Sequence, residues 1–176
     1  MTLYTREQKE SDKKILPLKS ENIPDELKVR PQWVVWKAVW RAESERLDKV
    51  PYSAESGRKA SSTDLLKWSA FENACETLET CKYSGLGFVF SSGDPYTGID
   101  LDNCVEQETG QIKQWALKII RYFDSYTELS ATATGVHIIV KGEVPNRRKA
   151  EIEVYSSKRF FTMTGHVLGA GGDQGA

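Results

Sequence analysis

The alternation of apolar and polar residues along the chain predicts a set of short β-strands. Aromatic and β-branched residues fill Trp33–Trp40, and glycine and apolar residues run through Gly85–Phe90, a composition typical of strands. In Ile99–Asp102 the alternation has a period of two, so both aspartates of this segment point to one face of a strand. Four further strands are predicted at Ser125–Ser130, Val136–Val140, Glu151–Tyr155 and Phe160–Thr164.

Apolar residues at helical spacing predict two longer helices, Leu66–Thr80 and Ile112–Tyr122. A short helix is expected to start within Asn22–Leu27, where a proline and two acids suit a first turn. A proline places Lys49–Tyr52 at a sheet edge or in a loop. Because strands outnumber helices and the two interleave, we expect an α+β fold with one sheet and helices packed on one of its faces.

The length of 176 residues predicts one domain with short flanking segments. Residues 1–20 are expected to form a flexible leader, because Met1–Lys14 is polar and rich in charge. Residues 21–168 contain all the predicted strands and helices. Residues 169–176 are rich in glycine and carry no core signal, which predicts a tail or a linker to a further region.

The formal net charge is −1, without the basic excess that nucleic-acid-binding domains usually carry. Any contact with nucleic acid must then come from local clusters of cations. The candidates, for which solvated loops are the alternative explanation, are Arg58 and Lys59 in one loop and Arg147, Arg148 and Lys149 in a second, predicted basic loop.

The cysteines Cys75, Cys81 and Cys104 are odd in number and irregularly spaced. This pattern fits neither a disulfide framework nor a zinc site and favours free thiols in a reducing compartment. No apolar stretch is long enough to span a membrane, and the start lacks the apolar region of a signal peptide. We therefore expect a cytoplasmic protein without membrane contact.

The two aspartates Asp100 and Asp102 are the first candidates for chemistry. On one face of a strand their Cβ atoms would lie roughly 6–7 Å apart. Two carboxylates at this separation can share a pair of Mg²⁺ or Mn²⁺ ions, which prefer oxygen ligands. An edge strand with solvated acids is the alternative.

A turn of small residues, from Thr132 to His137, is the candidate phosphate site. Its backbone could approach a ligand closely at Gly135, its hydroxyls at Thr132 and Thr134 could donate, and its amides could form an anion nest. His137 could donate to a phosphate oxygen or could be a structural histidine.

Two further candidates, Glu153 and Arg159, follow along the chain. Glu153 lies in an otherwise apolar strand, so it requires either a charged partner or a metal ion. Glu151 has the same parity but follows the basic loop, where a surface ion pair explains it. Arg159 has a planar fork that suits a triphosphate, although a surface turn residue would look the same.

The order of these motifs resembles a known family. Gly98–Asp102, Ser130–His137, Glu153–Tyr155 and Arg159–Gly165 occur in the order found in the N-terminal domain of bifunctional primase–polymerases. These belong to phage and plasmid replication proteins and to the archaeo-eukaryotic primase superfamily. Earlier segments, including the one that starts at Lys49, also look like this domain, so the resemblance covers roughly residues 23–165.

The resemblance implies a catalytic domain built on an RRM-like antiparallel sheet. It implies that Asp100 and Asp102, with Glu153 as the third acid, are catalytic and bind two Mg²⁺ or Mn²⁺ ions. It implies that His137 binds the phosphates of the incoming nucleotide, and Lys49 joins the nucleotide-binding candidates. The implied activity is template-directed nucleotidyl transfer. The implied partners are a single-stranded DNA template, a primer, NTP or dNTP, and a helicase region downstream.

The chain departs from the family pattern in the second motif, where Ala131 and Ala133 replace a proline and a glycine. This change leaves a non-catalytic module that binds nucleotides or nucleic acid as an alternative. A metal-dependent replication nuclease is a third hypothesis. A rolling-circle enzyme would require a His-x-His pair, and the histidines here are His137 and His166.

Overall fold

Two antiparallel sheets form the frame of the molecule in the computed structural model, which describes residues 15–44 and 46–169. The first sheet has the strand order β2-β1-β3-β9. Its strands are β2 (Arg46–Tyr52), β1 (Trp33–Arg41), β3 (Gly85–Phe90) and β9 (Arg159–Met163). The second sheet has the order β5-β6-β4-β8-β7. Its strands are β5 (Tyr126–Leu129), β6 (Val136–Lys141), β4 (Tyr96–Leu101), β8 (Ile152–Tyr155) and β7 (Arg147–Lys149).

The α+β class with antiparallel pairing is confirmed, but the strands form two sheets where one was expected. The chain passes from the first sheet to the second between β3 and β4, through a tight turn built on Asp94. Its buried carboxylate accepts hydrogen bonds from the backbone N–H groups of Ser91 and Tyr96, both at 2.8 Å. The amide of Gln32 also donates to Asp94, at 2.6 Å. These bonds hold the turn that redirects the chain.

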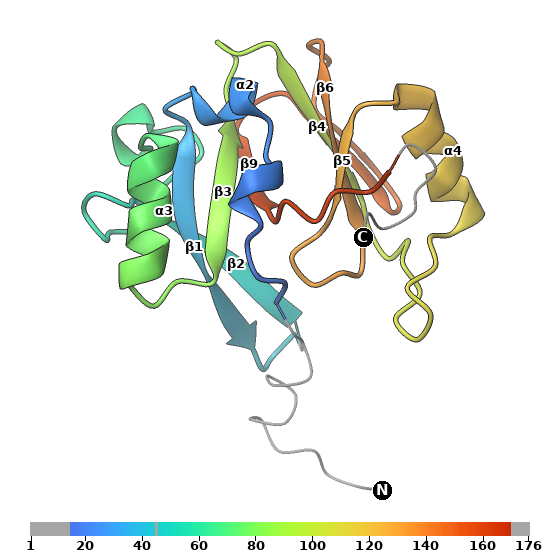
Figure 1. The fold of residues 1–176 in the computed structure, drawn as a ribbon, viewed down its shortest axis with the longest axis horizontal. Helices are drawn as coiled ribbons and strands as arrows, with labels where there is room; N and C mark the ends of the chain where they lie inside the picture. Colours follow the sequence, from blue (N-terminus) through green and yellow to red (C-terminus); the bar gives the residue numbers. More distant parts are fainter. Residues whose placement is uncertain (1–14, 45, 170–176) are drawn as a thin grey trace, which may run out of the picture.

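The helices lie on both sheets and not on one face of a single sheet. Helix α3 (Phe71–Thr80) packs on the first sheet, and α4 (Gln114–Phe123) packs on the second, at the opposite end of the molecule (Figure 1). Short helical turns occur at η1 (Ser20–Asn22), α2 (Asp25–Lys28) and η2 (Leu65–Lys67).

The predicted helix 66–80 begins only at Phe71. Ser69 forms an isolated bridge with Trp33, with backbone hydrogen bonds in both directions at 3.1 and 2.9 Å. This long-range pairing keeps the residues directly before α3, from Trp68 to Ala70, extended, and Leu65–Lys67 forms the separate turn η2. The predicted basic loop also differs, because Arg147–Lys149 pairs with β8 as the edge strand β7.

Two large buried cores fill the molecule. The first is aromatic and includes Trp33, Phe88 and Phe90, whose rings meet edge to face. It also includes Tyr96 of β4 and Ile139 of β6 from the second sheet. The second is aliphatic, with Leu101 and Ile138 packed under α4. Aromatic side chains bury large areas each, which makes the first core the larger contributor to apolar burial per residue.

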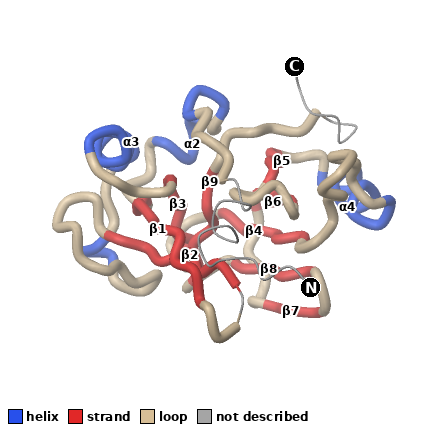
Figure 2. The backbone as a smooth tube through the Cα atoms, turned by 90° about the horizontal axis from the view of Figure 1, so that it is seen from below, coloured by secondary structure: helices blue, strands red, loops and turns tan. Residues whose placement is uncertain are grey.

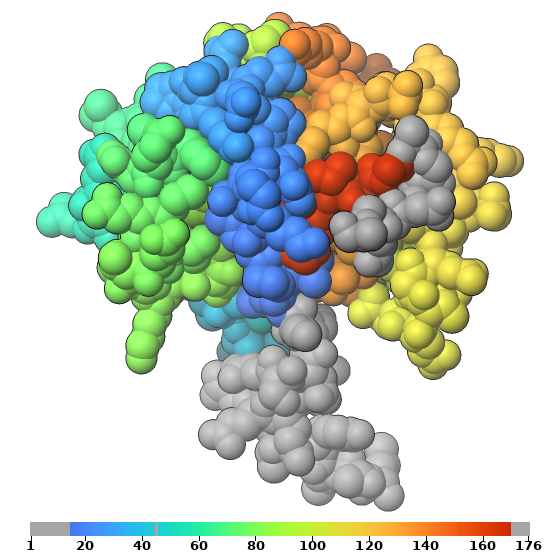
Figure 3. All heavy atoms as spheres, viewed as in Figure 1, coloured from blue at the N-terminus to red at the C-terminus, as the bar shows by residue number. Residues whose placement is uncertain are grey.

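Residues 15–22 run across the front of the molecule, between the parts formed by the two sheets (Figure 3). The backbone N–H of Leu16 donates to Ala131, and that of Lys19 donates to Thr164, both at 2.9 Å. The predicted leader, residues 1–20, lies largely outside the described residues, as does most of the predicted tail, 169–176. In the described part of the chain, no helix has the length and apolar character needed to cross a membrane.

Candidate active site

A cleft of about 850 Å³ lies where residues of the two sheets face each other. In the view from below, β2 lies near β4 and β8 (Figure 2). One wall of the cleft includes Lys49 of β2 and Arg159 of β9, and the other includes Asp100 of β4, His137 of β6 and Glu153 of β8. With Arg148 of β7, the cleft therefore combines residues from six strands of both sheets.

The register of the second sheet brings three predicted site residues side by side. Asp100 is paired with His137 on one neighbouring strand and with Glu153 on the other. Asp102 follows directly after β4 and also lines the cleft; its backbone N–H donates to the carbonyl of Glu151 at 2.8 Å. The three acids of the predicted metal set are therefore brought together, while the exposed Glu151 is not among the cleft residues.

The carboxylates of the cleft repel one another. Burial raises the pKa of Asp102, and the negative charges of Asp100 and Glu153 raise it further. A set of oxygen ligands that carries excess negative charge suits a hard divalent cation. Within residues 15–44 and 46–169, no group of three or more His, Cys, Asp or Glu side chains is already arranged around a metal position.

Glu153 is 4% exposed and has three partners. The hydroxyl of Tyr155 donates to it at 2.8 Å, Arg148 forms an ion pair at 2.6 Å, and Arg159 forms a longer one at 3.5 Å. A buried acid was expected to need either a charged partner or a metal ion, and the structure supplies the charged partners.

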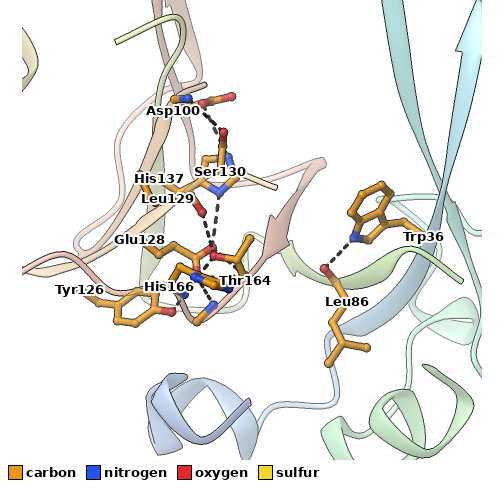
Figure 4. Close-up of polar contacts among 12 residues, drawn as sticks. Trp36, Leu86, Asp100, Tyr126, Glu128, Leu129, Ser130, His137, Thr164 and His166 are labelled. Carbon is orange, nitrogen blue, oxygen red and sulfur yellow. Dashed lines mark hydrogen bonds and ion pairs between the residues drawn. The ribbon is translucent and has the colours of Figure 1, made fainter. Parts of the chain in front are cut away.

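His137 is 2% exposed and is held on several sides. Its ring stacks on Phe161 with the centroids 4.8 Å apart. Its Nε2 atom lies 3.7 Å from Oδ1 of Asp100, and its Nδ1 atom lies 3.5 Å from Oε1 of Glu128 (Figure 4). The imidazole is therefore placed between the metal-binding candidate on one side and a fully buried acid on the other.

Glu128 is a residue that the analysis of the sequence missed. It lies in the short strand β5, directly opposite His137 in register. The apolar neighbours that singled out Glu153 are missing here, because β5 reads Tyr-Thr-Glu-Leu and has polar residues on both sides of it. Arg46 and Lys158, two further cations of the cleft, carried no distinctive pattern.

Lys49 faces the acids from the other sheet. Burial lowers the pKa of Lys49, while the charges of Asp100 and Asp102 act in the opposite direction. Its side chain lies opposite the two aspartates, whose charges favour the ammonium form. Arg159 adds a second cation, with its guanidinium over the ring of Tyr155 at 4.9 Å.

Other predicted candidates lie outside the cleft lining. The hydroxyls of Thr132 and Thr134 bond to each other at 2.9 Å. At Gly135 a Cβ atom would lie 2.5 Å from the carbonyl oxygen of Leu101, so glycine permits close approach of this turn to the end of β4. Of the predicted nucleic-acid contacts only Arg148 lines the cleft; the others are exposed elsewhere, namely Arg58, Lys59, Arg147 and Lys149.

Comparison with known proteins gives one informative match. The chain is 37% identical over 145 residues to a DNA primase-polymerase of Nitratiruptor phage NrS-1. This chain is therefore a relative of a phage primase-polymerase. The match covers 78% of this chain but 19% of the phage protein, so the chain spans about a fifth of that relative's length. This similarity confirms the resemblance to primase–polymerases that the ordered motifs indicated. No protein-family model matches the chain.

Proposed function

We propose that this domain is a template-directed nucleotidyltransferase, a DNA primase and DNA polymerase of a phage- or plasmid-type replication protein. The observation that carries the proposal is the register of β6, β4 and β8, which lines up His137, Asp100 and Glu153 at one wall of the cleft. The similarity to the phage primase-polymerase supports the same activity. The proposed substrates are NTP or dNTP, a primer and a single-stranded DNA template.

Asp100, Asp102 and Glu153 are the residues that would hold two Mg²⁺ or Mn²⁺ ions, because their donors are all carboxylate oxygens on one wall of the cleft. Bound ions of this kind lower the pKa of an attacking hydroxyl and stabilise the charge of the leaving group. For Glu153 to bind a metal ion, Arg148 must release the carboxylate oxygen that it now pairs with. The guanidinium of Arg148 is then available to bind the phosphates of the nucleotide or the template.

The cations of the cleft supply nucleotide binding in this proposal. Lys49 and Arg159 come from the first sheet and face the acids, so a triphosphate between the two walls meets positive charge on the side away from Asp100. His137 would donate to a phosphate oxygen from the other wall. Positioning and electrostatic stabilisation of this kind account for most of the catalysis of phosphoryl transfer.

We also propose that the second sheet, with its helix α4, corresponds to the RRM-like core implied by the resemblance. In this assignment the catalytic domain extends over residues 21–168. The flanking segments, and a helicase region downstream, stay predictions.

Primer extension tests the proposed activity. The protein is incubated with a primed single-stranded template, dNTP or NTP, and Mn²⁺, and products longer than the primer are measured. The parent protein should extend the primer, and Asp100→Asn with Asp102→Asn should not. Asp124→Asn is the matched control, because Asp124 is exposed and asparagine also tolerates its φ of 42°.

The alternatives predict different products. A folded parent that binds nucleotide without extending the primer would be a binding module. Shortened template or primer would indicate a nuclease. Extension by the folded double variant would contradict the assignment of the two aspartates.

A further inference from the structure

We propose that Glu128 is a positioning residue that holds the imidazole of His137 through its Nδ1 atom, so that Nε2 is directed into the nucleotide site. This inference rests on the proposed function for the role of His137. Glu128 would touch neither metal nor substrate, since it is 0% exposed and lies behind the histidine ring.

The carboxylate of Glu128 is fixed by hydrogen bonds. It accepts from the backbone N–H of Gly165 at 2.7 Å, from the backbone N–H of Thr164 at 3.0 and 3.1 Å, and from the hydroxyl of Tyr126 at 2.7 Å. A carboxylate that accepts several hydrogen bonds is stable inside a protein and has a defined orientation. Most of these bonds go to Oε2, which leaves Oε1 facing the histidine (Figure 4).

The Nδ1 atom of His137 needs this partner. Among the described residues it is one of two buried side-chain polar atoms without a hydrogen bond of ordinary geometry. Oε1 of Glu128 faces it at 3.5 Å, slightly beyond the usual N–H···O range of up to about 3.2 Å. Leaving a buried N–H unpaired costs about 1–3 kcal/mol, so a small approach of the two groups is favourable.

The remaining contacts leave the ring little freedom. Phe161 stacks on one face of the imidazole, and backbone pairing sets Glu128, His137 and Asp100 in line across β5, β6 and β4. With Nδ1 engaged by Glu128, only Nε2 is directed toward Asp100 and the cleft. The geometry resembles that of metal-bound histidines, whose second nitrogen is oriented by an outer carboxylate.

Glu128 also has a structural role that a test must separate from positioning. Its bonds to Thr164 and Gly165 tie β5 to the segment that follows β9. A variant that loosens this segment could weaken nucleotide binding without any effect through His137. The interaction between the two residues is isolated by a double-mutant cycle.

The cycle uses Glu128→Gln, His137→Ala and the double variant, with the dissociation constant of a non-hydrolysable dNTP as the readout. Glutamine can keep its oxygen toward Tyr126 and Gly165 but then presents an N–H group to Nδ1. Glu128→Gln should weaken binding about ten-fold or more in the parent background and less than about two-fold in the His137→Ala background. Glu143→Gln is the control, because it makes the same change at an exposed position outside the cleft lining, and it should change binding less than about two-fold. An equal loss in both backgrounds would assign Glu128 a purely structural role and overturn the proposal.

A second readout does not depend on nucleotide binding. Long-range ¹H–¹⁵N spectra of the histidine rings report which nitrogen carries hydrogen. In the parent protein Nδ1 of His137 should carry hydrogen, and Nε2 should carry it as well, because the ring must donate to Glu128 and to the phosphate at the same time. In Glu128→Gln only Nε2 should carry hydrogen. A parent ring with hydrogen on Nε2 alone would overturn the proposal even if the variant failed to fold. A parent that binds no nucleotide but shows the expected spectrum would contradict the proposed function and leave the placement of His137 by Glu128 supported.

Discussion

At the scale of single residues, two buried glutamates share one local design. Glu153 and Glu128 each accept a hydrogen bond from a tyrosine two positions away in the same strand, Tyr155 and Tyr126, at 2.8 and 2.7 Å. In both cases burial, followed by contributions from the glutamate, raises the pKa of the tyrosine, so the hydroxyl stays a donor. Each glutamate is thus oriented by its own strand and leaves an oxygen for a partner across the sheet.

The third acid of the proposed metal set can be distinguished from its neighbour by substitution. Glu153→Gln keeps the shape of the side chain and removes its charge. It should lower primer extension by at least the roughly 10–100-fold that groups around a metal contribute, and it should weaken binding of the second metal ion. Glu151→Gln is the matched control, because Glu151 is exposed and lies before β8; its extension rate should stay within a few-fold of the parent. The reverse pattern would mean that Glu151 is the third acid.

Asp102 makes the stability of the metal-free protein depend on pH. Its pKa in the folded protein lies above the usual 3.8, first because of burial and then because of Asp100 and Glu153. The folded protein therefore binds more protons than the unfolded chain in the window above 3.8, and the free energy of unfolding falls as pH rises through that window. Asp102→Asn, measured by thermal unfolding in a chelator, should raise Tm at pH 7, by about 2–4 °C for each kcal/mol gained.

The gain should disappear below the usual pKa, where Asp102 is protonated in both states. Asp124→Asn, the exposed control, should leave Tm nearly unchanged at both pH values. A gain for Asp102→Asn that persists at pH 3, or no gain at pH 7, would contradict this explanation.

At the scale of elements, strand β4 combines catalytic and packing roles. Asp100 faces the cleft, and Gly98, two residues earlier in β4, leaves room for aromatic rings. A Cβ atom at Gly98 would lie 2.5 Å from Phe161 and 2.5 Å from Phe90. Phe161 also packs against the ring of His137. The space that Gly98 leaves for Phe161 therefore helps to set the position of His137 in the proposed nucleotide site.

Gly98→Ala should therefore disturb both stability and nucleotide binding. Overpacking of a filled core costs about 1–3 kcal/mol, and displacement of Phe161 should weaken dNTP binding in the same variant. Thermal unfolding and nucleotide titration measure the two effects. Gly93→Ala is the control, because the nearest atom to its Cβ would be 4.0 Å away. A stable Gly98→Ala variant with parental nucleotide affinity would contradict the role given to Phe161.

Local patterns predicted the elements whose residues carry their own signal. The strands β1, β3, β5, β6, β8 and β9 were predicted within one residue of their observed bounds. Strand β4 begins three residues earlier than predicted, at Tyr96, because only Ile99–Asp102 shows the alternation. Strand β7 is basic and exposed, and only its pairing with β8 makes it a strand. The late start of α3 likewise depends on the pairing of Ser69 with Trp33. Contacts between distant segments decided these cases, and a local pattern contains no information about them.

The same limit applies to the candidate site. Asp100, His137 and Glu153 were predicted from motifs, and the register places them together. Thr132 and Thr134 were predicted from their hydroxyls, which bond to each other in the structure; their part in nucleotide binding stays a prediction. The hydroxyl groups alone could not reveal this, because the direction of the turn depends on its packing against the end of β4.

At the scale of the whole molecule, the cleft places cations on one wall and the acids of the predicted metal set on the other, an arrangement that the near-neutral net charge does not show. The chain carries 24 basic and 25 acidic residues, yet the three acids of the predicted metal set lie in the second sheet or directly after its strand β4. Lys49 and Arg159 of the first sheet, with Lys158 just before β9, face those acids. Asp48, an acid of the first sheet in the cleft lining, is paired with Arg46 at 2.9 Å. A near-neutral protein can thus present a local basic surface to a polyanion, which net charge alone cannot predict.

This local surface leads to a prediction for DNA binding. Arg46 and Lys158 line the cleft but have no predicted part in the chemistry. Removing both charges, by Arg46→Gln and Lys158→Asn, should weaken primer–template binding and should not change the extension rate at saturating DNA. Asparagine is chosen because Lys158 has a φ of 57°, which asparagine tolerates.

Salt dependence distinguishes contact with phosphate from a general charge effect. Each lost phosphate contact reduces the slope of log K against log salt concentration by about 0.7–0.9, so the double variant should lower it by about 1–2. Lys82→Gln with Lys118→Gln removes the same charge from exposed positions outside the cleft lining and should leave the slope unchanged. If both double variants reduced the slope equally, the DNA would be held by the overall charge of the molecule, and the cleft would not be its path.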